Sequence, residues 1–178
     1  MIETLISSKT RIKLLLKFFL NSKNTAYLRG LEEEFGESTN GIRLELNKFE
    51  KSGFLKSFIE GNKKVFTVNT MHPLFNDLNK IILKMVGLEY VIDYIVERIG
   101  DLEKVYLIGN LSKGQSTDII DLVLVGNSLN KNFLVQQIEK AEKKIGKKIR
   151  YVNFTTEEFD LNKIKEPGMH PLLLWSKL

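Results

Sequence analysis

Cysteine is absent from the 178-residue sequence, and histidine and proline are scarce, with two and three residues respectively. The lack of cysteine excludes disulfide bonds, a thiol nucleophile and any zinc site built on thiolates. His72 and His170 are far apart and each precedes a proline, so we interpret both as turn residues and expect no metal site. With so few histidines, no Ser/His/Asp set for nucleophilic catalysis is recognisable. We therefore expect neither a catalytic residue nor a cofactor.

Long hydrophobic runs are missing as well. In the first twenty residues, Lys9, Arg11, Lys13 and Lys17 interrupt the apolar side chains. The sequence therefore predicts neither a signal peptide nor a membrane span, and we expect a cytoplasmic protein that makes no membrane contact. Hydrophobic residues still make up 43% of the chain, which is enough for a buried core.

The net charge of +5 is distributed unevenly along the chain. Residues 1–85 hold 14 basic and nine acidic residues, whereas residues 86–178 hold 13 of each. Cations attract nucleic-acid phosphates and release the counterions around them. The excess marks the first half as the part that would bind a polyanion, although a charge of this size also serves solubility alone.

The first half has helical periodicity in three segments, followed by two short β segments. Apolar residues at helical spacing, such as Ile42, Leu46 and Phe49, predict helices with an inward stripe. Gly36 is placed to end the second helix, and residues 61–62 (Gly-Asn) are typical of a tight hairpin turn. The predicted helices cover residues 8–20, 27–35 and 38–51, and the predicted strands cover 54–60 and 63–69.

The second half alternates helices with short runs of β-branched residues, as small α/β domains do. We expect helices at 74–86, 88–99, 130–145 and 156–161, strands at 104–108, 119–125 and 148–154, a polar loop at 109–118, and an apolar tail packed on the domain. The elements together predict an α+β chain of two domains. Residues 1–72 form three helices and a β-hairpin, residues 73–86 a linker helix, and residues 87–178 a small α/β domain.

The stretch LRGLEEEFGESTNGIRLELNKFEKSGFLKSFIEGNKKVFTVN resembles the winged helix-turn-helix family, above all its bacterial ArsR/MarR-like regulator branch. The matching parts are a helix ended by Gly36, a cap at Ser38, a second helix with Ile42 inside and a basic hairpin tip. The resemblance covers roughly residues 8–72. It implies a domain that binds double-stranded DNA, with the helix at 38–51 in the major groove and the hairpin as the wing.

The outward face of the 38–51 helix carries side chains suited to DNA. Arginine and asparagine form bidentate hydrogen bonds with base edges, which makes Arg43 the strongest candidate for base recognition. Lysines on this helix and on the wing suit phosphate contacts, to which Lys9 and Arg11 would add. The candidate DNA-binding residues are Ser38, Thr39, Asn40, Arg43, Asn47, Lys48, Lys51, Lys63 and Lys64.

These residues also have plain structural interpretations. An exposed arginine on a helix is often only solvated, and lysines at a hairpin tip often only prevent edge-to-edge pairing. Glu32, Glu33 and Glu34 disfavour DNA on their face of the second helix. Some winged helices bind proteins instead, so a protein-binding module stays as an alternative.

The stretch VYLIGNLSKGQSTDIIDLVLVG resembles the core of minimal nucleotidyltransferase domains. In that family, a Gly-Ser loop holds the nucleotide phosphates, and two aspartates one residue apart on the next strand hold Mg²⁺. Gly109, Gly114 and Asp121 match this pattern. Asn110 stands at the serine position and Ile119 at the position of the first aspartate.

These departures predict a domain that kept the fold and lost catalysis. Asp118 lies three residues from Asp121, and residues three apart on a strand point to opposite faces, so only a bulge would bring the two to one metal. The loop could still bind a nucleotide or small-molecule effector. The candidate ligand-binding residues are Gly109, Asn110, Ser112, Lys113, Gly114 and Asp121.

The sequence as a whole predicts a non-enzymatic transcriptional regulator. Its first domain binds double-stranded DNA, and its second domain dimerises or senses an effector. We expect a homodimer formed through the helices of residues 74–99, because most regulators of this kind bind two-fold sites. The alternatives are an active, Mg²⁺-dependent nucleotidyltransferase and the protein-binding winged helix.

Overall fold

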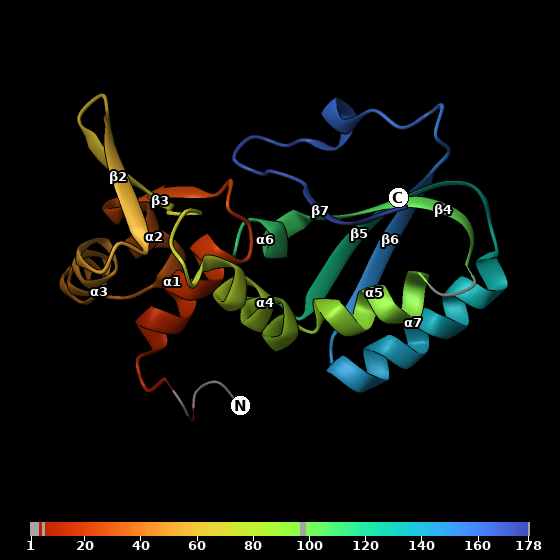
Figure 1. The fold of residues 1–178 in the computed structure, drawn as a ribbon, viewed down its shortest axis with the longest axis horizontal. Coiled ribbons are helices and arrows are strands. Elements are labelled where there is room, and N and C mark those ends of the chain that lie inside the picture. Colours follow the sequence, from red (N-terminus) through yellow and green to blue (C-terminus); the bar gives the residue numbers. More distant parts are fainter. Residues whose placement is uncertain (1–3, 5, 97–98, 178) are drawn as a thin grey trace. The chain divides into compact units, whose positions relative to one another are not determined.

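The computed structural model describes residue 4, residues 6–96 and residues 99–177 (Figure 1). The chain divides into two compact units, Met1–Ile82 and Leu83–Leu178. Within the described residues there are seven α-helices and two β-sheets, which makes the protein α+β, as predicted. None of the helices in these ranges is long and apolar enough to cross a membrane.

Three helices open the first unit: α1 (Lys9–Phe19), α2 (Leu28–Phe35) and α3 (Thr39–Lys51). Their ends follow local chemistry. The hydroxyl of Ser8 accepts a hydrogen bond from the Arg11 N–H at 3.2 Å and caps α1. Gly36 ends α2 with φ 63°, a left-handed conformation that favours glycine. All three predicted helices are thus confirmed to within one residue at each end.

The sheet of the first unit has the order β1-β3-β2 and is antiparallel throughout. Strands β2 (Leu55–Glu60) and β3 (Lys63–Val68) form the predicted hairpin around Gly61 and Asn62. Strand β1 (Thr25–Tyr27) was not predicted, because three residues are too few to show an alternating pattern. It pairs with β3, and this pairing brings Tyr27 opposite Val65.

The core of the first unit is apolar and rich in phenylalanine. Ile42, Leu46 and Phe49 are buried, as their spacing predicts, so the opposite face of α3 points outward. Phe54 lies with its ring centroid 5.9 Å from that of Phe19, 6.0 Å from that of Phe49 and 4.1 Å from the ring of His72. His72 also accepts a hydrogen bond from the Leu74 N–H at 3.2 Å, in agreement with its interpretation as a turn residue.

The second unit contains a four-stranded sheet of order β6-β5-β4-β7. Its strands are β4 (Gly100–Ile108), β5 (Ile119–Leu129), β6 (Lys148–Phe154) and β7 (Leu172–Ser176). Strands β5 and β6 are parallel, whereas β4 is antiparallel to both β5 and β7. The apolar tail is therefore a strand, which adds to the outer side of β4.

Four α-helices complete the chain: α4 (Phe75–Val86), α5 (Leu88–Val96), α6 (Gly109–Ser112) and α7 (Lys131–Ile145). The boundary between the two units falls within α4, and α5 packs against α7 in the second unit (Figure 1). The end expected for α5 includes residues 97 and 98, which lie outside the described ranges.

Two expectations for the second half were wrong. The loop at 109–118 begins with the short helix α6, because backbone N–H groups there bond back to Gly109 and Asn110. The helix expected at 156–161 is a turn, followed by a 3-10 helix at Leu161–Ile164. Asp160 explains the shift, because its carboxylate accepts a hydrogen bond from the Asn162 N–H at 2.8 Å and caps the later segment.

Candidate nucleic-acid interface

The outward face of α3 carries polar and basic side chains that are mostly exposed to solvent. Asn40, Arg43 and Asn47 are exposed, and Thr39 is half-buried at the first turn. Ser38 has a structural task, because its hydroxyl accepts a hydrogen bond from the Gly41 N–H at 3.3 Å and caps the helix. Arg43 and Asn47 are therefore the main side chains on the face that would approach a ligand.

A pocket of about 480 Å³ lies beside this face, between the start of α2, the middle of α3 and the hairpin. It brings together four of the predicted DNA-binding residues, which come from segments up to 21 positions apart. The lining residues are Tyr27, Leu28, Arg29, Arg43, Leu46, Asn47, Asn62, Lys63, Lys64 and Phe66. Four of them are cations and none is an acid, so the pocket attracts anions.

The four cations of the pocket differ in their partners. Within the described chain, no carboxylate pairs with Arg29, Arg43 or Lys63. The Lys63 ammonium lies over the ring of Tyr27, with Nζ 4.2 Å from the ring centroid. Lys64 is neutralised in part, because its Nζ lies 2.7 Å from the Glu50 carboxylate. Three of the four positive charges are thus available to a ligand.

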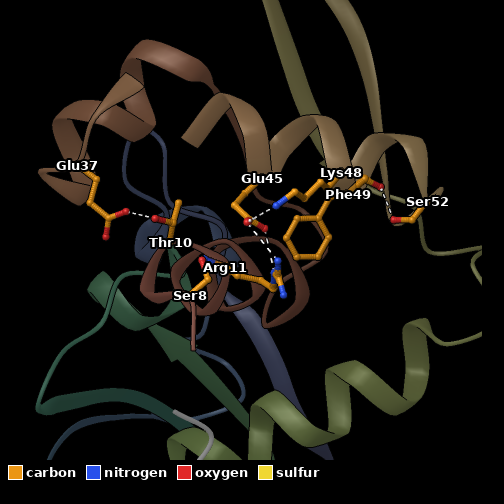
Figure 2. Close-up of polar contacts among 8 residues, drawn as sticks. All are labelled: Ser8, Thr10, Arg11, Glu37, Glu45, Lys48, Phe49 and Ser52. Carbon is orange, nitrogen blue, oxygen red and sulfur yellow. Dashed lines mark hydrogen bonds and ion pairs between the residues drawn. The ribbon is translucent and has the colours of Figure 1, made fainter. Parts of the chain in front are cut away.

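Lys48, at the far end of α3, belongs to a network centred on Glu45 (Figure 2). Glu45 is only 8% exposed, and it accepts hydrogen bonds from Arg11 at 2.9 and 3.2 Å and from Lys48 at 3.0 Å. The Arg11 hydrogen bonds, followed by that of Lys48, lower the pKa of Glu45 below its ordinary value despite its burial. The pKa of Arg11 is raised by the same contact.

This network changes the roles expected of two cations. The guanidinium group of Arg11, on α1, is bound to Glu45 on α3 and links the two helices. A phosphate contact of Arg11, which the sequence predicts, would therefore compete with this ion pair. The side chain of Lys48 is exposed, but its ammonium group is paired with Glu45. Lys51 is exposed at the end of the helix. Both lysines lie outside the pocket that contains Arg43.

One acidic residue of α2 and one of the loop after it contact α1. Glu34 lies 2.7 Å from Lys17, and Glu37 lies 2.7 Å from Lys13, whose Nζ also donates to the carbonyl of Phe35. Glu37 also accepts a hydrogen bond from Thr10. Lys13 and Thr10 together lower the pKa of Glu37, although desolvation opposes them. Glu34 and Glu37 are therefore neutralised by lysines of α1, and no acid of this segment lines the pocket.

The second candidate site, around the loop after β4, is closed by its own contacts. Ser112 is fully buried, and its hydroxyl donates to the carbonyl of Gly109 at 2.8 Å. Gly114 is buried and donates its N–H to the carbonyl of Leu111. Lys113 lies 3.7 Å from Glu166, and Asn110 is exposed, with its carbonyl accepting the N–H of Gln115.

Asp121, the one matching metal aspartate, is bound by an arginine. It lies on β5 directly beside Arg150 on β6, and the guanidinium donates to both carboxylate oxygens, at 2.6 and 2.9 Å. The contact raises the pKa of Arg150. Gly109 sits against the same carboxylate, because a Cβ there would lie 2.5 Å from an oxygen of Asp121, and its φ of +69° favours glycine independently.

Asp118 does not join Asp121. It precedes β5, its side chain is 99% exposed, and its nearest cation is Lys147 at 4.0 Å. Within the described residues, no cluster of three or more His, Asp or Glu side chains is placed to hold a metal ion. Instead, Asp121 on β5 pairs with Arg150 on β6, and Asp118 lies near Lys147, just before β6.

The structure adds residues that the sequence did not single out. Arg29 and Asn62 line the pocket beside Arg43 and Lys63, and Tyr27 supports Lys63. Asn62 was recognised only as a turn residue. The signal for Arg29 was a cation at the start of the second helix, but without the fold nothing indicates that this turn lies next to the hairpin.

Comparisons with known proteins give little guidance. No protein-family model matches the chain, and a search of curated proteins gives no match. Among solved structures, the chain is similar to reduced HlyU from Vibrio cholerae N16961, with a TM-score of 0.37 and 14% sequence identity. The match covers 49% of this chain and 83% of that one. A likeness this distant does not indicate a function, which must be inferred from the residues themselves.

Proposed function

We propose that this protein is a DNA-binding transcriptional regulator whose first unit is a winged helix-turn-helix domain. One observation carries the proposal: Arg43 and Asn47 on the outward face of α3 line one pocket with the lysines at the tip of the β2–β3 hairpin, and no acid lines it. Duplex DNA is a uniform polyanion with readable base edges, and a helix with arginine and asparagine beside a basic hairpin matches both features.

In this proposal, α3 enters the major groove. Arg43 and Asn47 face the base edges, since both side chains are exposed and both can form bidentate hydrogen bonds. Lys63 and Lys64 on the hairpin contact phosphates, which fixes the register of α3 without reading sequence. The core contacts of Ile42, on the opposite face, hold the helix in place.

The second unit, in this proposal, is a nucleotidyltransferase-like domain without catalysis. The order β4, α6, β5, α7, β6 supports the resemblance. The guanidinium of Arg150 occupies both oxygens of Asp121, which supports the loss of metal binding. Its role would then be effector sensing or assembly. An active enzyme would instead show Mg²⁺-dependent turnover of a nucleoside triphosphate that is lost in Asp121→Asn.

The proposed assembly is a homodimer, and α4 offers a surface for it. Leu78 and Ile81 lie on α4, and Leu74 lies directly before it at the same helical spacing. Leu74 and Ile81 are 51% and 48% exposed. A single apolar stripe on a helix is buried by a second copy in two-fold symmetric dimers. Such a dimer would present two copies of α3 to the two halves of a near-palindromic site.

The experiment that tests the proposed function is a binding titration of the full chain. The duplexes are one from upstream of its own gene and a scrambled duplex of equal composition, each at two salt concentrations. We expect tighter binding to the upstream duplex and a loss of affinity for both at higher salt. Arg43→Ala should remove the preference, whereas Lys80→Ala, an exposed cation on α4, should leave it unchanged.

A failure to retain either duplex at low salt would contradict the proposal. That result would favour a protein-binding module, which one observation supports: Leu44, Phe58 and Ile59 are 53%, 46% and 72% exposed on α3 and β2. Exposed apolar residues of this size are common in protein interfaces. Binding of both duplexes with equal affinity would reduce the proposal to a nonspecific DNA-binding protein.

A further inference from the structure

We propose that the pocket between α2, α3 and the hairpin binds a phosphate group, and that Arg29 is one of its ligands. This inference rests on the proposed function in one respect: a phosphate of the DNA backbone is one source of the group. The other source is a free phosphorylated molecule such as a nucleotide. The chemistry of the pocket is the same for both, and the experiment below separates them.

The pocket holds its hairpin lysines before any ligand arrives. The ring of Tyr27 lies between Lys63, whose Nζ is 4.2 Å from the ring centroid, and Gly30, where a Cβ would lie only 3.2 Å from the ring. Lys64 has its Nζ 5.0 Å from the centroid of Phe66 and 2.7 Å from Glu50. An ammonium placed over a ring still has N–H donors directed away from it, so Lys63 keeps donors for an anion.

The opposite wall supplies two guanidinium groups. Arg29 on α2 and Arg43 on α3 line the same pocket, and within the described residues neither guanidinium group has a side-chain hydrogen bond or ion pair. Other cations of this unit, such as Lys13 and Lys17, each have a carboxylate at 2.7 Å. An anion in this cavity would therefore meet two guanidinium groups that no carboxylate of the described chain neutralises.

The remaining lining fits a phosphate better than a metal or a cationic ligand. No acid lines the pocket, and Asn47 and Asn62 add neutral amide donors. Guanidinium groups match the tetrahedral oxygens of phosphate with two parallel hydrogen bonds. The volume of about 480 Å³ lies within the range of sites for small ligands, and Leu28 and Leu46 give it an apolar wall against which a base or sugar can pack.

The experiment compares two probes on the full chain: adenosine monophosphate, followed by calorimetry, and the upstream duplex, followed by fluorescence anisotropy. The variants are Arg29→Gln, Arg29→Lys and Lys80→Gln. Arg29 is exposed and has no partner to lose, so Arg29→Gln should keep the wild-type circular dichroism and melting temperature. Lys80→Gln removes the same charge from α4, outside the pocket.

We expect Arg29→Gln to weaken at least one probe by about tenfold, the scale of hydrogen bonds to a charged group. Arg29→Lys should bind more tightly than Arg29→Gln but less tightly than the wild type, because lysine keeps the charge but cannot form two parallel hydrogen bonds. Lys80→Gln should bind as the wild type does. If the mononucleotide binds and displaces the duplex, the free ligand is a source of the phosphate. If only duplex binding falls in Arg29→Gln, the source is the backbone.

Two results separate a failure of this inference from a failure of the proposed function. If the wild type binds the duplex, Arg29→Gln binds it equally well and adenosine monophosphate does not bind, the phosphate pocket is wrong and the proposed function stands. If the mononucleotide binds through Arg29 but no duplex does, the pocket stands and DNA binding is wrong. If neither probe binds the wild type, both are wrong.

Discussion

Ion pairing separates the basic side chains of the first unit into two groups. Those with a carboxylate within 4.0 Å stabilise the packing of α1, α2, α3 and the hairpin, and they are Arg11, Lys13, Lys17, Lys48 and Lys64. Of the cations without such a partner in the described chain, Arg29, Arg43 and Lys63 gather at one pocket. The others lie outside it, and they are Lys9, Lys23, Lys51, Lys56 and Lys80. The number of cations in the sequence therefore overstates the charge available to a ligand, and their positions identify where it is.

The first residue-scale prediction compares two cations of α3 that differ in pairing. Arg43→Ala should weaken binding of the upstream duplex by about 1–3 kcal/mol and reduce its preference over the scrambled duplex, because a bidentate base contact is lost. Lys48→Ala should have a smaller effect, since Lys48 is already bonded to Glu45 at 3.0 Å. Fluorescence anisotropy with both duplexes measures the difference. An equal loss in the two variants would mean that only charge matters.

The second concerns Glu45, whose pKa is lowered by Arg11 and Lys48. A depressed carboxyl pKa stabilises the fold above the unfolded-state pKa of about 4.3, and the stabilisation is lost as the pH falls through the lower native pKa. Glu45→Gln should therefore reduce the free energy of unfolding near neutral pH by about 1 kcal/mol, the scale of a partly exposed charged pair. The two proteins should converge only as the pH falls below the native pKa of Glu45, which lies under its ordinary value.

Urea unfolding of both proteins at several pH values measures this difference. Glu60→Gln is the control, since Glu60 is exposed at the end of β2 and makes no ion pair in the described chain. A gap between wild type and Glu45→Gln that stays constant with pH would show that Arg11 and Lys48 do not favour the charged carboxylate. A reversed sign would show that burial outweighs the ion pairs.

At the scale of elements, the sequence predicted those helices and strands whose position depends on residues close together in the chain. The three helices of the first unit follow from the apolar stripe and the caps at Ser8 and Ser38, and the hairpin follows from its Gly-Asn turn. Strands β1 and β7 were missed because each is short and is fixed only by a partner strand far along the chain. The partner of Asp121 was missed for the same reason, since Arg150 is adjacent only through the register of β5 and β6.

The hairpin gives a prediction at this scale. Lys63→Ala with Lys64→Ala should weaken duplex binding without changing its sequence preference, since phosphate contacts position the protein but do not read bases. Each phosphate contact adds about 0.9 to the slope of log K against log salt concentration. The double variant should lower the slope by about 0.9 to 1.8, because Lys64 is already paired with Glu50. Titrations at four salt concentrations measure the slope. An unchanged slope would exclude the hairpin from the DNA interface.

For the whole chain, the change in charge lies close to the boundary between the two units, which follows Ile82. Residues 1–85 carry the entire net charge of +5, and residues 86–178 carry none. The pocket lies within the first unit, and the second unit consists of a sheet whose loop is closed by its own hydrogen bonds and by the pair of Asp121 with Arg150. This division supports a first unit that binds DNA and contains the proposed dimer residues of α4, and a second unit that senses an effector or adds to the assembly. The helix α4, which contains the boundary, is then the element through which two copies would meet.

The prediction at this scale is that Ile81→Lys turns a dimer into a monomer. Ile81 is 48% exposed, and in a two-fold interface every substitution occurs twice, so two lysines would lie in or near the same apolar contact. We expect the dissociation constant of the dimer to rise by at least about tenfold, which corresponds to about 1.4 kcal/mol. The matched control is Asn76→Lys, which adds the same side chain at an exposed position on another face of α4.

Sedimentation equilibrium over a range of protein concentrations measures the association of wild type and both variants. A dimer binds the two half-sites of a palindrome with one set of contacts on each, so Ile81→Lys should also weaken binding to a full site far more than binding to a half-site. A wild-type monomer at micromolar concentrations would exclude the α4 dimer. A variant that stays dimeric and binds DNA more tightly would instead place α4 near the duplex, because an added lysine there strengthens contact with phosphates.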